Sequence, residues 1–134
     1  MIPKGAPSGL YKNNIHYDFS GSLSLLANGS SQLTFQVDAG YNYIARRWTY
    51  FSDAPFSIRI SDNDKKLMSN PVPSQCLVGY QNAGDTIRAV WLMNNFYPRG
   101  YMFTGGNNIV IDLSDTSGAP NVVNIYITGF KILK

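Results

Sequence analysis

Apolar and polar residues alternate one by one in two runs near the C-terminal end of the chain, residues 107–113 and 122–133. The regularly spaced apolar positions of these runs are Ile109, Ile111, Leu113, Val123, Ile125 and Ile127. The residues at the alternate positions are Asn108, Val110, Asp112, Asn124, Tyr126 and Thr128, which are polar or amphipathic apart from Val110. A period of two places one face of a strand on a core and the other toward solvent. The alternation therefore predicts two β-strands, and the turn-forming residues at 114–121 predict that the strands form a closing hairpin.

The same alternation, interrupted by turn residues, continues back through the rest of the chain. Strands are predicted at 15–19, 22–26, 33–37, 41–52, 56–60 and 86–93, with a short edge strand at 65–69. Asn28-Gly29 is the strongest two-residue hairpin signal, because both central residues of a type I′ turn need a positive φ. The stretches 70–85 and 96–106 contain several glycines and prolines and are predicted as loops.

These elements predict one all-β domain: a single antiparallel β-sandwich, jelly-roll-like, with about eight strands. No helical periodicity is seen, and the chain has no glutamate, which is a favoured residue of helix surfaces. A length of 134 residues fits one domain. The sandwich is expected at 15–134, after an extended N-terminal arm at 1–14. The arm has two interpretations: a disordered tail, or a segment that docks on a neighbouring subunit.

Charge and cysteine content narrow the classes of partner. The formal net charge is +3, and the basic pairs Arg46-Arg47 and Lys65-Lys66 are interpreted as solvated strand or turn positions rather than a nucleic-acid patch. Cys76 is the single cysteine, which excludes an intramolecular disulfide and is typical of a reducing compartment. The scattered charges therefore predict no nucleic-acid partner. No secretory signal and no membrane-spanning run is recognised, so a membrane is not expected as a partner either.

Candidate catalytic and metal-binding residues are few. His16 is the single histidine and falls on the polar face of its strand, and Cys76 is interpreted as a small buried residue without catalytic context. Asp62-Asn63-Asp64 begins like a calcium loop but lacks the glycine and glutamate of an EF-hand, which leaves open a calcium site of another type. The other aspartates lie beside turns or strand ends, where they cap the backbone. We predict no cofactor, no metal and no enzymatic activity.

Aromatic residues are the remaining candidates for function. Those that exceed the expected need of a small core are Tyr41, Tyr43, Trp48, Tyr50, Phe51, Trp91, Phe96, Tyr97, Tyr101 and Phe103. Such rings supply contact area at protein interfaces, and they can also form a stacking platform for a sugar. Protein–protein contact is the preferred interpretation, with carbohydrate as the alternative. The candidate interface residues are Lys4, Tyr11, Lys12, Arg46, Arg47, Trp48, Phe96, Tyr97, Arg99, Tyr101 and Phe103.

Several segments together carry a family resemblance. They are the early strand that ends in Leu25-Leu26 before an Asn-Gly turn, APFSIRI at 54–60, the Pro98 loop leading to IVID at 109–112, and NIYITGFKI at 124–132. In these features the chain resembles small accessory virion proteins of tailed bacteriophages, the capsid decoration or cement proteins with a jelly-roll-like sandwich. The resemblance spans residues 15–133. Tail, baseplate and fibre components are similar in appearance.

The resemblance implies a structural protein of the virion, made in the host cytoplasm. It implies that the partner is the major capsid protein or another virion protein, whose lattice is stabilised by bridging adjacent subunits. A homo-oligomer, dimer or trimer, would add weak contacts through avidity. The arm and the aromatic loops are the expected contacts, and Arg46, Arg47 and Arg99 would pair with acidic groups. The alternatives are a carbohydrate-binding β-sandwich module or a tail, baseplate or fibre component.

Overall fold

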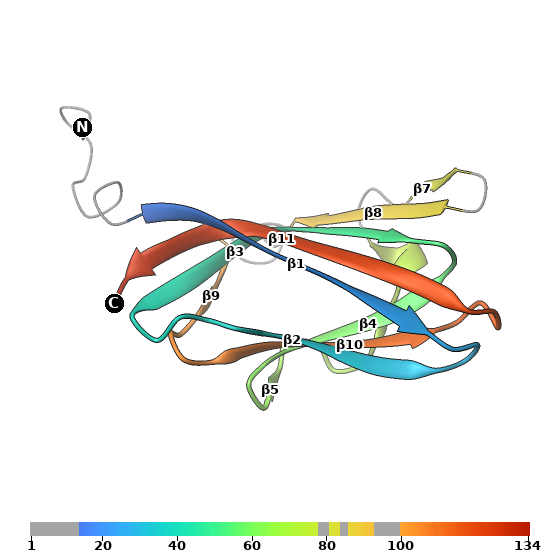
Figure 1. Ribbon diagram of the computed structural model, residues 1–134, viewed down its shortest axis with the longest axis horizontal. Helices are drawn as coiled ribbons and strands as arrows, with labels where there is room; N and C mark the ends of the chain where they lie inside the picture. The colour runs from blue at the N-terminus through green and yellow to red at the C-terminus, as the bar shows by residue number, and fades with distance from the viewer. Residues whose placement is uncertain (1–13, 78–80, 84–85, 93–99) are drawn as a thin grey trace.

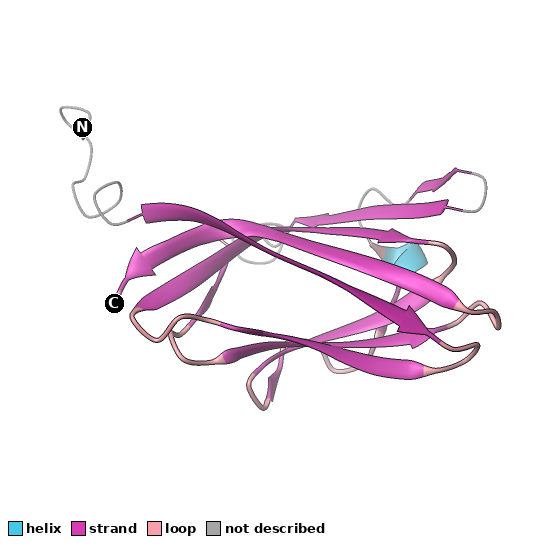
Figure 2. Ribbon diagram, viewed as in Figure 1, coloured by secondary structure: helices cyan, strands magenta, loops and turns pink. Residues whose placement is uncertain are grey.

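The chain folds into two antiparallel β-sheets that face each other (Figure 1). In this computed structural model the described residues are 14–77, 81–83, 86–92 and 100–134. Within them the regular structure is β-strand, apart from one short 3-10 helix, η1 (Ser74–Cys76), as Figure 2 shows. The prediction of an all-β sandwich is confirmed. The predicted arm falls outside the described residues except for Asn14, its last residue.

The larger sheet has six strands. Its order is β1-β11-β3-β8-β7, and β9 pairs with β3. The bounds are β1 (Asn14–Leu25), β11 (Asn121–Leu133), β3 (Tyr41–Ser52), β8 (Thr86–Leu92), β7 (Gln81–Ala83) and β9 (Tyr101–Phe103). Because β8 and β9 pair with successive parts of β3, they extend the same edge of that strand.

The smaller sheet has five strands, in the order β2-β10-β4-β5, and β6 pairs with β4. The bounds are β2 (Ser30–Gln36), β10 (Asn108–Asp115), β4 (Phe56–Asp62), β5 (Lys65–Lys66) and β6 (Val72–Pro73). The short strands β6 and β9 and the turn η1 lie in stretches that the sequence pattern predicts as loops.

Each sheet interleaves the beginning and the end of the chain. β11 lies between β1 and β3, and β10 lies between β2 and β4. The strands β1 to β4 alternate between the two sheets, and β10 and β11 also lie in different sheets. This strand order is that of a jelly roll, in which two Greek keys wind the chain across both sheets. The predicted jelly-roll-like architecture is therefore confirmed.

The two predicted hairpins are wrong. The turn at Asn28-Gly29 joins β1 of the larger sheet to β2 of the smaller one. Residues 116–120 likewise join two different sheets, from β10 of the smaller sheet to β11 of the larger one. Asn28 has the expected positive φ, +56°, whereas Gly29 does not, so the turn is not of type I′. The Gly29 N–H donates to the Leu26 carbonyl over 2.8 Å. A turn signal thus predicts that the chain reverses, but not which sheet receives the next strand.

The core fills the space between the sheets. Its largest fully buried side chains are Trp48, Tyr43, Tyr50, Phe56, Phe103, Ile58, Ile60, Ile109, Ile111, Leu113 and Ile125. Each large apolar side chain buried in this way stabilises the fold by about 1.5–3 kcal/mol relative to leaving it exposed. Four of the aromatic residues that exceed the expected need of a small core are therefore parts of this core.

A β-bulge in β3 changes which of its residues face the core. The pairing of β11 with β3 shifts by one position between Thr128 and Gly129, which leaves Arg46 as the extra residue of β3. Before the bulge the odd-numbered residues of β3 are buried, and after it the even-numbered residues are buried. Arg46 and Arg47 are both exposed at the point where the alternation changes.

Candidate functional site

The outer face of the larger sheet carries a regular array of side chains on three adjoining strands, β1, β11 and β3. The register places them in two rows across the sheet: Ser20, Tyr126 and Thr49 in one, and Ser22, Asn124 and Phe51 in the next. These side chains point away from the core because the residues before and after them on each strand face inward. Hydroxyl and amide groups therefore lie side by side with two aromatic rings.

A shallow groove of about 350 Å³ runs over these two rows. The six side chains line it together with Gly21 and Ile125. Both rings are open to solvent, since Tyr126 is 45% exposed and Phe51 is 40% exposed. The groove thus combines apolar ring surface with small hydrogen-bonding groups, on strands that belong to a continuous sheet.

The ring of Tyr126 is held in place by Asp18. The Tyr126 hydroxyl donates a hydrogen bond to Oδ2 of Asp18 over 2.7 Å. This bond, and then the negative charge of Asp18, raise the pKa of Tyr126, because a phenolate would lose the bond and face the carboxylate. Asp18 is the next outward residue of β1 before Ser20, so the bond draws the ring across β1 and along the surface of the sheet.

Asp18 also contacts His16. The Nε2 atom of His16 lies 3.1 Å from Oδ1 of Asp18, and the imidazole packs edge-on against Phe130 with ring centroids 6.0 Å apart. The His16 side chain is 61% exposed, which confirms the predicted position on the polar face of its strand. The pair beside the groove therefore consists of an exposed histidine and a half-buried aspartate, not of a buried acid–base unit.

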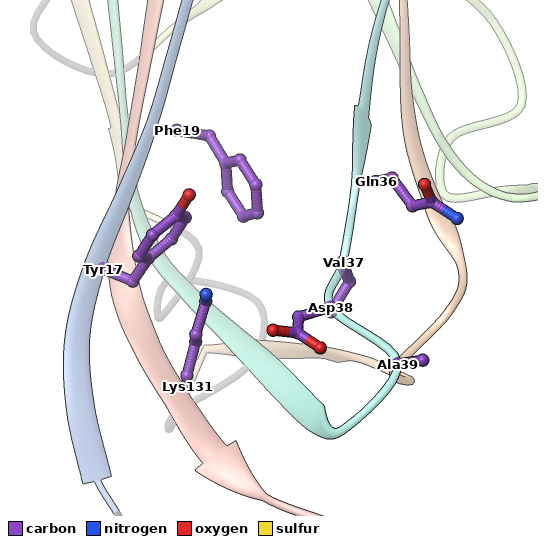
Figure 3. A pocket seen from close by; sticks show the side chains of 7 residues that line it. All are labelled: Tyr17, Phe19, Gln36, Val37, Asp38, Ala39 and Lys131. Atoms are coloured by element: carbon purple, nitrogen blue, oxygen red, sulfur yellow. The ribbon is translucent and has the colours of Figure 1, made fainter.

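A second pocket opens between the two sheets (Figure 3). It has a volume of about 390 Å³ and is lined by Tyr17, Phe19, Gln36, Val37, Asp38, Ala39 and Lys131. The Lys131 ammonium lies 3.7 Å from the centroid of the Tyr17 ring and 5.6 Å from that of Tyr41. Both distances are within the range of a cation–π interaction, which keeps this charge at the pocket.

The charges of the second pocket have opposite signs. Figure 3 shows the ammonium of Lys131 beside the Tyr17 ring, with Asp38 on the opposite wall. Oδ1 of Asp38 accepts the N–H of Gly40 over 3.0 Å, in the turn that leads to β3. The pocket is therefore a polar cavity with one cation, one anion and aromatic walls, chemistry that suits a small polar molecule.

Among the predicted interface residues, Arg46 and Arg47 lie at the surface. Within the described part of the chain, neither guanidinium has a hydrogen-bond or ion-pair partner. Trp48 and Phe103 are fully buried, so the prediction that they lie on a contact surface is wrong. The bulge turns Trp48 inward, and Phe103 pairs with buried Tyr43 and faces the core with it.

Of the other predicted interface residues, Tyr101 alone lies within the described part of the chain. Tyr101 is half-buried, and its hydroxyl donates to Oδ2 of Asp62 over 2.9 Å, which links the larger sheet to the end of β4. The remaining candidates lie outside the described residues: Lys4, Tyr11, Lys12, Phe96, Tyr97 and Arg99.

Cys76 was expected to be buried, and this prediction is wrong. It lies at the end of the short turn η1, where its side chain is exposed. Among the described residues no cluster of three or more histidine, cysteine, aspartate or glutamate side chains could hold a metal ion. In the same part of the chain, no helix is long and apolar enough to cross a membrane.

The groove residues were not recognised from the sequence as a site. Tyr126 and Asn124 fall on a face that reads as ordinary sheet surface, and Ser20, Ser22 and Thr49 carry no motif. The available signal is the single tyrosine among small polar residues at the outward positions of β11. That signal becomes a site only when the register brings three strands, distant in sequence, side by side.

Comparisons with known proteins do not identify a family. No protein-family model and no curated protein matches the chain. A solved structure of the Drosophila NLP core, described as giving insight into pentamer formation and histone binding, is similar with a TM-score of 0.34. The match has 13% sequence identity and covers 84% of this chain and 97% of that chain. Similarity at this level carries no argument about function.

Proposed function

We propose that this chain is a non-enzymatic structural protein of a bacteriophage virion, which binds the capsid lattice and stabilises it as a decoration or cement protein. The proposal starts from the resemblance of residues 15–133 to such accessory proteins. The observation that carries it is the pair of exposed arginines at the bulge of β3. Within the described residues these two guanidiniums have no partner of their own.

The bulge gives the arginine pair an uncommon geometry. In a regular strand successive side chains point to opposite faces, so one of two adjacent residues would face the core. The extra residue in β3 leaves both Arg46 and Arg47 exposed. A guanidinium makes paired, charge-assisted hydrogen bonds with a carboxylate, so this pair suits an acidic patch on a partner protein.

A lattice would strengthen contacts of this kind. Single exposed ion pairs contribute only about 0–1 kcal/mol each, so one pair alone does not hold two proteins together. A dimer or trimer that bridges neighbouring lattice subunits engages several pairs at once, and their combined affinity rises through effective concentration. The major capsid protein is the proposed partner. The arm and the loop with Phe96, Tyr97 and Arg99 are further proposed contacts, outside the described residues.

Co-sedimentation with intact phage particles tests the proposal. We expect the protein to sediment with the particles, and the double variant Arg46→Gln/Arg47→Gln to bind about tenfold more weakly, because rim charges steer and hold a complementary surface. The matched control is Lys65→Gln/Lys66→Gln, which removes the same charge from exposed residues of β5 in the other sheet. A protein that does not sediment with particles, or a control that weakens binding equally, contradicts the proposal.

A further inference from the structure

We propose that the groove on the outer face of the larger sheet binds a saccharide, with Tyr126 and Phe51 as the stacking rings. The proposal does not depend on a role in the virion, because it concerns the chemistry of one surface of the folded chain. It rests on three features: two exposed rings, small polar side chains between them, and a preorganised tyrosine.

The rings supply the apolar part of the site. A pyranose has faces made of C–H groups, which pack against the electron-rich face of an aromatic ring. Phe51 lies on β3 and Tyr126 on β11, in adjacent rows of the sheet, so the two rings are diagonal neighbours. The Cα atoms of diagonal positions on a sheet lie about 7–8 Å apart. The Tyr126 ring leans away from Phe51 toward Asp18, so the two rings would contact different units of an oligosaccharide.

The polar side chains supply the hydrogen bonds. Within the described residues, the hydroxyls of Ser20, Ser22 and Thr49 make no hydrogen bond to the protein. Asn124 uses its Nδ2 in a long contact, 3.3 Å, to the Phe51 carbonyl, and its Oδ1 has no such bond to any described residue. A hydroxyl can donate and accept at once, which matches the hydroxyl groups of a sugar.

The hydrogen bond from Tyr126 to Asp18 reduces the entropic cost of binding. A tyrosine whose hydroxyl is fixed 2.7 Å from a carboxylate has fewer rotamers to lose when a ligand packs on its ring. The groove volume of about 350 Å³ lies within the range of small-molecule sites, roughly 300–1,000 Å³.

Other occupants fit this groove less well. The cores of protein interfaces are depleted in serine, whereas two serines line the floor here. Single-stranded nucleic acid stacks on rings within a positively charged groove, but the described residues that line this groove include no lysine or arginine, and Asp18 lies beside it. The groove therefore fits a neutral, hydroxyl-rich ligand with an apolar face better than it fits a protein or a nucleic acid.

Saturation-transfer NMR with the full chain tests the proposal. The probes are three neutral oligosaccharides, cellotetraose, chitotetraose and mannotetraose, each at millimolar concentration. We expect saturation transfer to the ring C–H protons of at least one probe. For that probe, Tyr126→Ala and Phe51→Ala should each weaken binding about tenfold in calorimetric titration, since each removes one stacking surface. Tyr126→Phe, which keeps the ring, should weaken binding less than Tyr126→Ala.

The control is Met102→Ala. Met102 is 52% exposed on β9 and pairs with Ile44, away from the groove, so its removal should leave binding unchanged. Circular dichroism of each variant verifies that the sheets are intact.

The proposal is overturned if none of the three probes shows transfer, if Met102→Ala weakens binding as much as the groove variants, or if a dT10 oligonucleotide binds in their place. It is also overturned if Tyr126→Ala converts an oligomer to a monomer in sedimentation, since the groove would then be a subunit interface. The particle assay can fail while these outcomes support the saccharide site, so the two proposals are tested separately.

Discussion

At the scale of single residues, the buried carboxylate of Asp115 accepts several hydrogen bonds that its turn-rich surroundings in the sequence do not predict. It is 5% exposed at the end of β10. Its carboxylate accepts the N–H groups of Asn28 (2.8 Å) and Gly118 (3.0 Å), the hydroxyl and N–H of Ser117 (2.6 and 3.1 Å), and the Asn121 amide (3.2 Å). Burial by itself would raise the pKa of Asp115, but these hydrogen bonds favour the charged form and hold its pKa well below the usual range. The residue joins the turn after β1 to the turn after β10.

Replacing Asp115 with asparagine should destabilise the protein. The variant turns one acceptor oxygen into an NH2 group that faces donors, and it leaves N–H groups without a partner. We expect a loss of about 2–4 kcal/mol in the free energy of unfolding at pH 7, measured by urea denaturation. Asp112→Asn is the control, because Asp112 makes one exposed bond to Gln32 and should change stability by less than about 0.5 kcal/mol.

The same residue predicts a pH dependence. A carboxyl whose pKa is lowered by folding stabilises the native state fully above its unfolded pKa of about 4, and this contribution is lost as the pH falls toward the lower folded pKa. The difference in stability between the wild type and Asp115→Asn should therefore shrink from about pH 5 to pH 2. Urea titrations at several pH values measure it, and a constant difference would contradict the assignment.

At the scale of elements, the bulge in β3 depends on a glycine opposite it. A Cβ on Gly129 would collide with the Ile44 carbonyl oxygen and lie 2.8 Å from the Tyr43 hydroxyl. Tyr43 packs over this position, and its hydroxyl donates to the carbonyls of Tyr17 (2.9 Å) and Ile127 (3.3 Å), which ties β3 to β1 and β11. Burial first, and then the nearby charge of Asp18, raise the pKa of Tyr43, so the hydroxyl stays a donor.

Gly129→Ala should therefore cost about 1–3 kcal/mol, as expected for overpacking at a buried position. The matched control is Gly40→Ala, where the nearest atom to an added Cβ is Oδ1 of Asp38 at an ordinary 3.6 Å. Thermal melting of both variants measures the difference. Equal melting temperatures for the two variants would show that the strands adjust around the bulge without cost.

The sequence pattern predicts the strands more reliably than their pairing. Alternation depends on each residue and its neighbours two positions away, so β3, β10 and β11 are found to within about two residues. The sheet that receives a strand depends on contacts between distant parts of the chain, so both predicted hairpins fail. Trp48 was predicted at the surface because the aromatic residues exceed the expected need of a small core, but the bulge shifts the alternation inside β3 and turns Trp48 inward. The groove could not be predicted either, because it depends on the register of three strands.

At the scale of the whole molecule, the two sheets share one core, and each sheet contains strands from both ends of the chain. Ile111 on β10 and Ile125 on β11 are at most 1% exposed and belong to the same buried cluster. β11 pairs with both β1 and β3, and β10 pairs with both β2 and β4. Neither sheet can therefore separate from the other without exposing this core.

Unfolding should consequently occur in one cooperative transition. We expect Ile111→Ala and Ile125→Ala, one in each sheet, to lower the free energy of unfolding by about 2–5 kcal/mol each, without changing the denaturant dependence m. Tryptophan fluorescence and far-UV circular dichroism should give coincident transitions for both variants. Leu26→Ala serves as the control, since Leu26 is 80% exposed and should change stability by less than about 0.5 kcal/mol. Two separate transitions in either core variant would mean that the sheets unfold independently, which a shared jelly-roll core does not allow.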